Sequence, residues 1–346
     1  MTIDVHAHCV PVGLIEALQR DGSGYGIEIL HGGPDRGPDR GLHGNTAPTA
    51  RIAGRVTAGP LRPDLLDVGA RIAAMDQAGV RTQVLSSWID LTAYALPPEA
   101  GVRYARTFNE LLAGTVNLHP DRFLGLCIVP LQSPALAAEE LRHAVRQLGM
   151  VGVEIATTVD GAELDDPGLD PFWEAAEDLR CLVLLHPYRS LEGRGLARFF
   201  LSNLVANPAE STVAVAHLIF GGVLERFPGL RVCVVHGGGF LPYQAGRLDR
   251  GYHAKAALTA GQLSRPPSAW VRHLYYDTVV HDPAVLSALV GLVGADHVVL
   301  GSDYPFEMGD QDPVATVREA PGLDDDQRAL ICQGNLFRLF AAVRRT

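Results

Sequence analysis

The stretch Asp4-Val5-His6-Ala7-His8 ends the apolar run with which this chain of 346 residues begins. In a β-strand, residues i and i+2 point to the same face, so His6 and His8 can reach one ion together while Ala7 faces away. A single alternating pair is a weak signal, because histidines also end strands as ordinary polar groups. The pair therefore needs support from elsewhere in the chain.

Three later apolar runs end in potential metal ligands in the same manner. Residues 181–185 lead into His186, residues 231–235 lead into His236, and residues 297–300 lead through a Gly-Ser pair into Asp303. Three of the four runs thus end in imidazole, and the last one ends in a carboxylate. The repetition indicates a site built at the ends of strands.

Short apolar runs alternate with helical patterns along the whole chain, which is typical of β-α units. Eight candidate strands are found at residues 2–6, 81–86, 123–129, 152–156, 181–186, 231–236, 273–277 and 297–301. Eight such units predict a closed parallel barrel, a (β/α)8 fold, whose catalytic groups lie at the carboxyl ends of the strands. All five ligand-type residues fall at those ends.

We expect a single domain over residues 1–346, with a Gly/Pro/Arg-rich insertion after the first strand at about 22–63. The insertion contains the near-repeat of residues 34–41, Pro-Asp-Arg-Gly-Pro-Asp-Arg-Gly, which is typical of a surface loop. Residues 51–62 are the better candidate for a lid over the site.

Composition excludes several classes of protein. A formal net charge of -10 without a basic cluster argues against nucleic-acid binding. No apolar stretch reaches membrane-spanning length, and the N-terminus lacks the pattern of a signal peptide. Five cysteines without paired spacing are typical of reduced thiols, so we expect a cytoplasmic protein.

The strand-end motifs carry a resemblance to a known family. The motifs Asp4-Val5-His6-Ala7-His8, His186-Pro187, His236-Gly237-Gly238-Gly239 and Gly301-Ser302-Asp303-Tyr304-Pro305-Phe306 resemble those of the amidohydrolase superfamily. Residues 75–80, Tyr276-Asp277-Thr278 and Gly334-Asn335 extend the likeness over nearly the whole chain. Within the superfamily, the chain is most similar to the 2-amino-3-carboxymuconate 6-semialdehyde decarboxylase group, which implies a barrel of the metal-dependent hydrolase type.

The resemblance implies one zinc ion per chain, held by His6, His8, His186 and Asp303 with a water molecule. His236 would stay unligated and act as general acid/base, or else serve as a fifth ligand or a structural group. Zinc accepts imidazole and carboxylate ligands and keeps an open position when it is catalytic, and manganese or cobalt share these ligand types. Glu154, on the fourth strand, leaves open a bridge to a second ion.

A carboxylate substrate calls for a cationic anchor, and a guanidinium can bind it with two parallel hydrogen bonds. The resemblance implies that Arg247 reaches into a neighbouring subunit's site, which predicts a homodimer. A second arginine would come from the segment after the first strand, where Arg55 is our choice and Arg51 and Arg62 are alternatives. Other residues expected near the substrate are Trp88 and Phe306, against its unsaturated part, and Asp277 and His281, after the seventh strand.

The favoured reaction is zinc-dependent decarboxylation of an unsaturated or aromatic carboxylic acid, as the resemblance implies. The same residues support hydrolysis of a lactone or amide, in which a metal-activated water attacks the carbonyl group. Tyr188 stands where the decarboxylase group usually carries tryptophan, so the substrate of that group does not transfer directly. A zinc-binding protein without activity is a third reading, although structural zinc sites tend to be closed and rich in cysteine.

Overall fold

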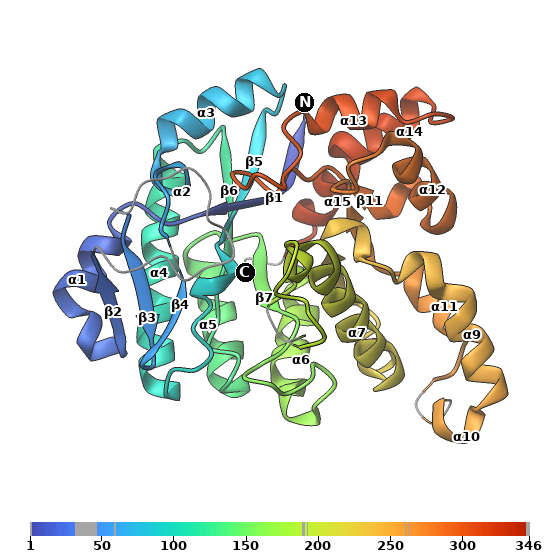
Figure 1. The fold of residues 1–346 in the computed structure, drawn as a ribbon, viewed down its shortest axis with the longest axis horizontal. Helices are drawn as coiled ribbons and strands as arrows, with labels where there is room; N and C mark the ends of the chain where they lie inside the picture. The colour runs from blue at the N-terminus through green and yellow to red at the C-terminus, as the bar shows by residue number, and fades with distance from the viewer. Residues whose placement is uncertain are drawn as a thin grey trace.

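The alternation of strands and helices builds an eight-stranded parallel sheet that curls into a barrel (Figure 1). The computed structural model describes residues 2–31, 47–58, 60–188, 191, 193–259, 261 and 263–343. In sheet order, the strands are β1 (Ile3–Cys9), β5 (Thr82–Ser87), β6 (Phe123–Cys127), β7 (Gly152–Ala156), β8 (Leu182–His186), β9 (Arg231–Val234), β10 (Tyr275–Asp277) and β11 (Val298–Val299).

Backbone hydrogen bonds between β1 and the segment that follows β11 complete the barrel. The amide of Val5 donates to the carbonyl of Leu300 at 2.9 Å, and the amide of Asp303 donates to the carbonyl of His6 at 2.8 Å. Further along, the amide of His8 donates to the carbonyl of Tyr304 at 2.7 Å. The seam between the two ends of the sheet therefore brings Asp303 beside the two histidines of β1.

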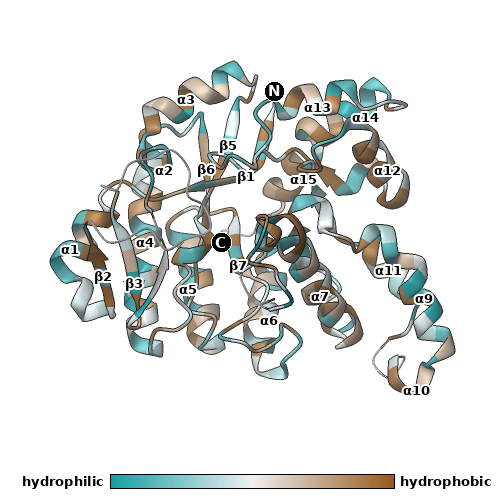
Figure 2. Ribbon diagram, viewed as in Figure 1, coloured by the Kyte–Doolittle hydropathy of each residue, from teal (hydrophilic) through white to brown (hydrophobic). Residues whose placement is uncertain are grey.

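Helices surround the barrel, and several begin with the proline that the first turn tolerates. On the first half of the chain they are α1 (Leu14–Tyr25), α2 (Pro63–Leu66), α3 (Val68–Gln77), α4 (Pro98–Leu118), α5 (Pro134–Gln147) and α6 (Asp170–Leu179). On the second half they are α7 (Asn207–Phe220), α8 (Val223–Arg226), α9 (Ala245–Ala254), α10 (Ala256–Thr259), α11 (Pro267–Val271), α12 (Pro283–Val293), α13 (Pro313–Glu319), α14 (Asp325–Ala329) and α15 (Asn335–Ala341). Many of them alternate between apolar and polar segments in Figure 2, as expected of helices with one face on the core.

The predicted barrel fold is confirmed, with one informative difference in the first strand. The strand continues to Cys9 instead of ending at residue 6, so both histidines lie inside β1. The pairing of β1 with β5 also shifts between Asp4 and Ala7. In a regular strand, Asp4 would share a face with the histidines, whereas this irregularity lets it bond to other partners.

The predicted insertion contains a small antiparallel sheet at one side of the barrel (Figure 1). Its strands are β2 (Ile27–Leu30), β3 (Thr49–Ile52) and β4 (Arg55–Ala58), in that order. The near-repeat of residues 34–41 lies outside the described residues. After β4, the helix α2 is joined to the end of β1, because the amide of Val10 donates to the carbonyl of Leu65 at 2.9 Å.

Apolar side chains pack around the ligand-bearing strands on the N-terminal side of the ligands. Leu184 lies on β8 two residues before His186, and it belongs to a buried cluster with Val5, Val84, Leu126 and Val299. A larger cluster fills the space between the barrel and its helices. Within the described ranges, no helix combines the length and the apolar character needed to cross a membrane.

The close pairing of β7 with β8 yields a prediction about stability. A Cβ atom at Gly152 would overlap the carbonyl oxygen of Leu182, so Gly152→Ala should lower the free energy of unfolding by about 1–3 kcal/mol. The matched control is Gly114→Ala on the exposed side of α4, where a Cβ meets no atom within 4 Å. That change should raise the free energy of unfolding by about 0.5–1 kcal/mol. Urea unfolding followed by circular dichroism measures both, and equal midpoints for the two variants would contradict the packing argument.

Candidate metal centre and its pocket

Four side chains from three parts of the barrel meet at one point. His6 and His8 come from β1, His186 is the last residue of β8, and Asp303 follows β11. All four are buried, and their candidate ligand atoms lie within 4.8 Å of one another. The Nε2 atoms of His6 and His8 are 3.0 Å apart, and Asp303 Oδ1 lies 3.3 Å and 3.1 Å from them.

The other ring nitrogen of each histidine has an acceptor for its proton. His8 Nδ1 lies 2.6 Å from the carbonyl of Ser87, and His186 Nδ1 lies 2.9 Å from the carbonyl of Pro187. A carbonyl can only accept, so both rings carry their proton on Nδ1 and leave a lone pair on Nε2. His6 Nδ1 lies 2.7 Å from a carboxylate oxygen of Asp277, which favours the same tautomer.

Three lone pairs and one carboxylate oxygen therefore converge in a buried space. Asp303 Oδ1 has no hydrogen-bond donor among the described residues. Such a cluster of acceptors is unfavourable unless a cation lies between them. The arrangement, in which each imidazole is oriented by a further hydrogen bond, is typical of protein metal sites. The four residues fit a divalent metal ion.

The pKa shifts of His186 and Asp303 agree with this interpretation. Burial and the neighbouring imidazoles hold the pKa of His186 well below its usual range, so the ring is neutral. Burial alone would raise the pKa of Asp303, but the neighbouring histidines, His6 first and then His236, hold it well below its usual range. A neutral imidazole and an ionised carboxylate are the forms that bind metal.

The carboxylate of Asp4 fixes the two chain segments that carry three of these ligands. Its Oδ1 accepts the amides of His6 and Ser302, each at 3.0 Å. Its Oδ2 accepts the Ser302 hydroxyl at 2.6 Å and the side-chain amide of Gln83 at 2.8 Å. Gln83 in turn accepts from the buried guanidinium of Arg71, which also donates to the carbonyl of His8 at 2.6 Å.

His236 stands beside the four ligands. Its Nε2 lies 3.4 Å from Asp303 Oδ2, and its ring centroid lies 5.2 Å from that of His6 and 5.3 Å from that of His186. Burial would lower the pKa of His236, but the bond to Asp303 and the charges of Asp303 and Asp277 raise it above its usual value. The ring can therefore hold and donate a proton near neutral pH.

The backbone that presents His236 is unusual. His236 has a φ of 55°, and the three glycines after it have φ values between 59° and 77°. A Cβ atom at Gly238 would lie 2.5 Å from the ring of Tyr276, so the turn needs glycine there. Asp277 holds the turn, because its Oδ1 accepts the amide of Gly237 at 2.8 Å while its Oδ2 binds His6. Asp303, with a φ of 59°, is also in the left-handed region.

Glu154 lies deeper in the barrel than the four ligands. In the pairing of β7 with β8, it stands opposite Leu184, whereas Ala156 stands opposite His186. Its Oε1 lies 3.6 Å from His8 Nδ1, the nitrogen that faces away from the cluster, and 3.3 Å from the hydroxyl of Ser86. Burial raises the pKa of Glu154 to about 7. This position favours one ion over a bridged pair.

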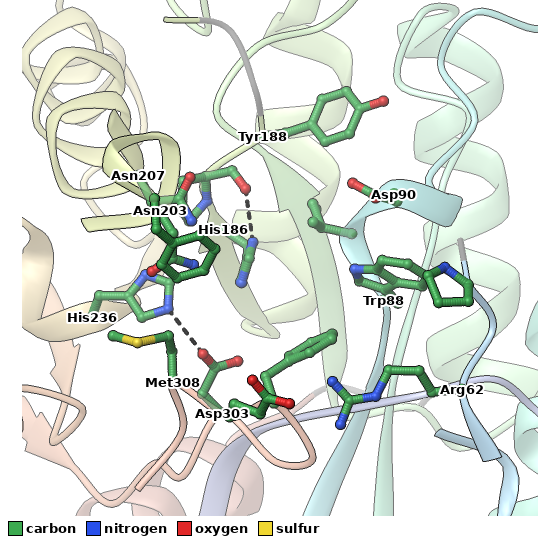
Figure 3. A pocket seen from close by; sticks show the side chains of 16 residues that line it. Arg62, Trp88, Asp90, His186, Tyr188, Asn203, Asn207, His236, Asp303 and Met308 are labelled. Atoms are coloured by element: carbon green, nitrogen blue, oxygen red, sulfur yellow. Dashed lines mark hydrogen bonds and ion pairs between the residues drawn. The ribbon is translucent and has the colours of Figure 1, made fainter. Parts of the chain in front are cut away.

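A cavity of about 400 Å³ opens above the centre, and a second one of about 340 Å³ adjoins it. Figure 3 shows His236, Asp303 and Met308 on one side of the first cavity, across from Trp88 and Arg62. The residues that line both cavities are Asn203, Asn207, His236, Asp303 and Met308. His236 and Asp303 thus stand where the two cavities meet.

The predicted aromatic residues do line the first cavity. The ring centroids of Trp88 and Phe306 are 5.9 Å apart, and Phe306 lies 5.3 Å from the ring of His8. Both rings therefore border the space next to the candidate metal ligands. His281 lines the second cavity, and Asp277 acts through His6 and Gly237 without lining either.

Of the three candidate arginines near the first loop, the structure places Arg62 at the first cavity. Arg62 lines the first cavity, where Asp64 and the carbonyl of Pro305 accept from its guanidinium. Arg55 is exposed at the turn between β3 and β4, opposite Ile52, and Arg51 pairs with Glu28 at the surface. Arg62 immediately precedes α2, and the hydrogen bond between α2 and the end of β1 holds it at the mouth of the barrel.

One predicted substrate-binding residue does not line a cavity of the single chain, and three residues that do line both cavities were not predicted. Arg247 is exposed on α9 and does not line either cavity of the single chain. Asn203, Asn207 and Met308 line both cavities, yet no motif pointed to them. They lie in irregular or helical segments whose place over the barrel depends on the tertiary fold.

The comparisons with known proteins agree with this geometry. The chain matches the amidohydrolase family over residues 3–341. The 2-amino-3-carboxymuconate-6-semialdehyde decarboxylase of Dictyostelium discoideum is 30% identical over 335 residues, which cover 97% of this chain and 90% of that protein. The gamma-resorcylate decarboxylase of Rhodococcus jostii is 30% identical over 273 residues, covering 71% of this chain and 80% of the relative.

A solved structure extends the comparison to the fold. The crystal structure of 5-carboxyvanillate decarboxylase from Sphingomonas paucimobilis matches with a TM-score of 0.79 at 28% sequence identity, and the match covers 98% of each chain. The resemblance inferred from the strand-end motifs is confirmed. This chain belongs to the amidohydrolase family of enzymes.

Proposed function

We propose that this protein is a zinc-dependent decarboxylase that releases CO₂ from an unsaturated or aromatic carboxylic acid. The observation that carries the proposal is the convergence of three imidazole lone pairs and Asp303 Oδ1 beside His236, at the base of a cavity of about 400 Å³. The three relatives named above support the reaction class, because each is called a decarboxylase.

Three imidazoles and one carboxylate suit zinc, and the same donors accept manganese or cobalt. His6, His8, His186 and Asp303 would hold the ion. When bound, a divalent ion supplies Lewis acidity, which polarises a substrate oxygen and stabilises developing negative charge.

His236 is placed to manage the proton that the reaction requires. Decarboxylation breaks the bond between the substrate carbon and its carboxylate, CO₂ leaves, and one proton replaces it on the carbon. His236 Nε2 lies 3.4 Å from Asp303 Oδ2. Burial alone would lower the pKa of His236, but Asp303 and Asp277 raise it above its usual value. It can therefore carry the proton to the carbon, while Asp277 holds the turn that orients it.

The first cavity offers groups that suit a planar acid. Trp88 and Phe306 present aromatic rings, and aromatic faces pack well against an unsaturated substrate. Arg62 uses Nε and Nη2 on Asp64 and Pro305, and its Nη1 has no hydrogen bond to the described part of the chain. That nitrogen is available to a substrate carboxylate.

We also propose that the working unit is a homodimer in which Arg247 enters the partner's site. Support comes from the family resemblance and from the surface around the cavity mouth. Phe240, Tyr243 and Leu204 are exposed there, with relative accessibilities of 44%, 40% and 47%. Large exposed apolar patches mark interaction sites, and a second copy of the chain would cover this one.

A cytoplasmic location belongs to the same proposal. None of the five cysteines forms a disulfide, and four of them are buried. Reduced, buried thiols are typical of proteins in a reducing compartment.

Metal analysis tests the ligand set. The wild-type protein should contain about one divalent ion per chain, whereas His186→Ala and Asp303→Ala should lose it, because each removes a donor from a four-ligand site. His236→Ala should keep the ion. His217→Ala is the matched control, since His217 lies on α7, pairs with Asp165 and does not line the cavity. Elemental analysis of the purified proteins decides, and full metal content in His186→Ala would refute the assignment.

Turnover tests the reaction and the role of His236. Metal-loaded wild-type protein should release CO₂ from one or more members of a panel of unsaturated and aromatic acids, and a chelator should abolish the release. His236→Ala should lower kcat by about 10²–10⁴-fold, because it removes the proton donor, with His217→Ala unchanged. Full activity in His236→Ala would remove it from the mechanism. A product that gains an oxygen from labelled water, without CO₂, would instead show hydrolysis.

Subunit complementation tests the dimer. Arg247→Ala and His186→Ala should each be inactive alone, the first for lack of the partner's arginine and the second for lack of metal. Random pairing of the two chains by co-expression should restore about a quarter of the wild-type sites, because one site of each mixed dimer is complete. A monomer by analytical ultracentrifugation, or no recovery in the mixture, would contradict the proposal.

A further inference from the structure

Two asparagines occupy the wall shared by the two cavities. Asn203 lies in the π-helical turn Ser202–Ala206, and Asn207 is the first residue of α7. They are four positions apart in helical chain, so both side chains point to the same side. Figure 3 shows them next to His186 and His236, on the side opposite Trp88 and Arg62. Both are half-buried and line both cavities.

Neither carboxamide forms a hydrogen bond with the described residues. The fully buried asparagines of this protein behave differently. Asn109 donates to the carbonyl of Ile128 and to Glu140, each at 2.9 Å, and Asn335 donates to two carbonyls at 2.8 Å. In both of these buried carboxamides, the amide nitrogen is paired within the fold. The donors and acceptors of Asn203 and Asn207 are available to a ligand that enters the cavities.

The rest of the pocket defines the orientation of that ligand. Trp88 and Phe306 provide the aromatic surface, and the guanidinium of Arg62, paired with Asp64, lies over the Phe306 ring, 5.9 Å from its centroid. An acid that packs against these rings with its reacting carbon near the centre presents one edge to His236 and the asparagines. Met308, also on this wall, offers no hydrogen bond of comparable strength.

We propose that Asn203 and Asn207 form a subsite that selects acids carrying a neutral hydrogen-bonding substituent, a hydroxyl or carbonyl group, on the edge facing α7. This inference rests on the proposed function of the same site. A carboxamide donates and accepts but carries no charge, so it recognises such a group by hydrogen bonds. A methyl group in the same place would leave both amides without water and without a partner, which costs binding energy.

Matched pairs of probes test the subsite. The probes are the 2-, 3- and 4-hydroxybenzoates and the methylbenzoates of the same geometry, which differ in hydrogen bonding more than in size. Binding to the metal-loaded protein is followed by calorimetry and by tryptophan fluorescence, since Trp88 lines the cavity while Trp173 and Trp270 are buried in the core. The best hydroxybenzoate should bind about tenfold tighter than its methyl counterpart.

Variants then assign the preference to the two residues. Asn203→Leu/Asn207→Leu should reduce the preference to about one to twofold, because neither leucine can bond to the hydroxyl. The corresponding double serine variant should keep part of the preference, which separates hydrogen bonding from volume. Met308→Leu is the matched control on the same wall and should leave the ratio unchanged. Circular dichroism confirms that each variant is folded.

The outcomes separate this inference from the proposed function. An unchanged ratio in the leucine variant, or no binding of any probe to the wild-type protein, overturns the subsite. If the ratio depends on the asparagines but no acid releases CO₂, the decarboxylase proposal fails and the subsite stands. If CO₂ is released, kcat/KM for each pair must show the same dependence, and CO₂ release without that dependence overturns the subsite alone.

Discussion

The constraint on which this structure depends is the convergence of three imidazole lone pairs and one carboxylate oxygen in a buried space at the base of a cavity. Each imidazole donates a hydrogen bond from Nδ1 to an acceptor behind it, and the acceptors are Asp277 and the carbonyls of Ser87 and Pro187. The tautomers are thereby set by the fold and not by the ion. The cost of gathering these groups is offset when a cation binds between them.

Two further carboxylates hold this arrangement in place. Asp4 accepts four hydrogen bonds and ties β1 to the segment that carries Asp303. Asp277 binds a ring nitrogen of His6 with one oxygen and the amide of Gly237 with the other. Asp277 therefore supports both His6 and the turn that presents His236. A displacement of one would shift the other through this carboxylate.

The sequence was most predictive where function depends on strand periodicity. His6, His8, His186, His236 and Asp303 all follow from apolar runs that end at one edge of a barrel, and the structure gathers them there. The sequence left three arginines open near the first loop, and the structure places Arg62 at the pocket, through the long-range bond between α2 and the end of β1. Asn203 and Asn207 gave no signal, since a carboxamide becomes notable only when its partners are seen to be missing.

His236 and Asp303 share a left-handed backbone, with φ values of 55° and 59°. Among side chains that tolerate this conformation, asparagine and aspartate rank first after glycine. Replacement of Asp303 by asparagine would thus keep the chain path while removing the charge. Evolution can therefore silence this centre by a single change that leaves the barrel intact, and descendants of such a lineage would keep the fold and the pocket as a binding protein.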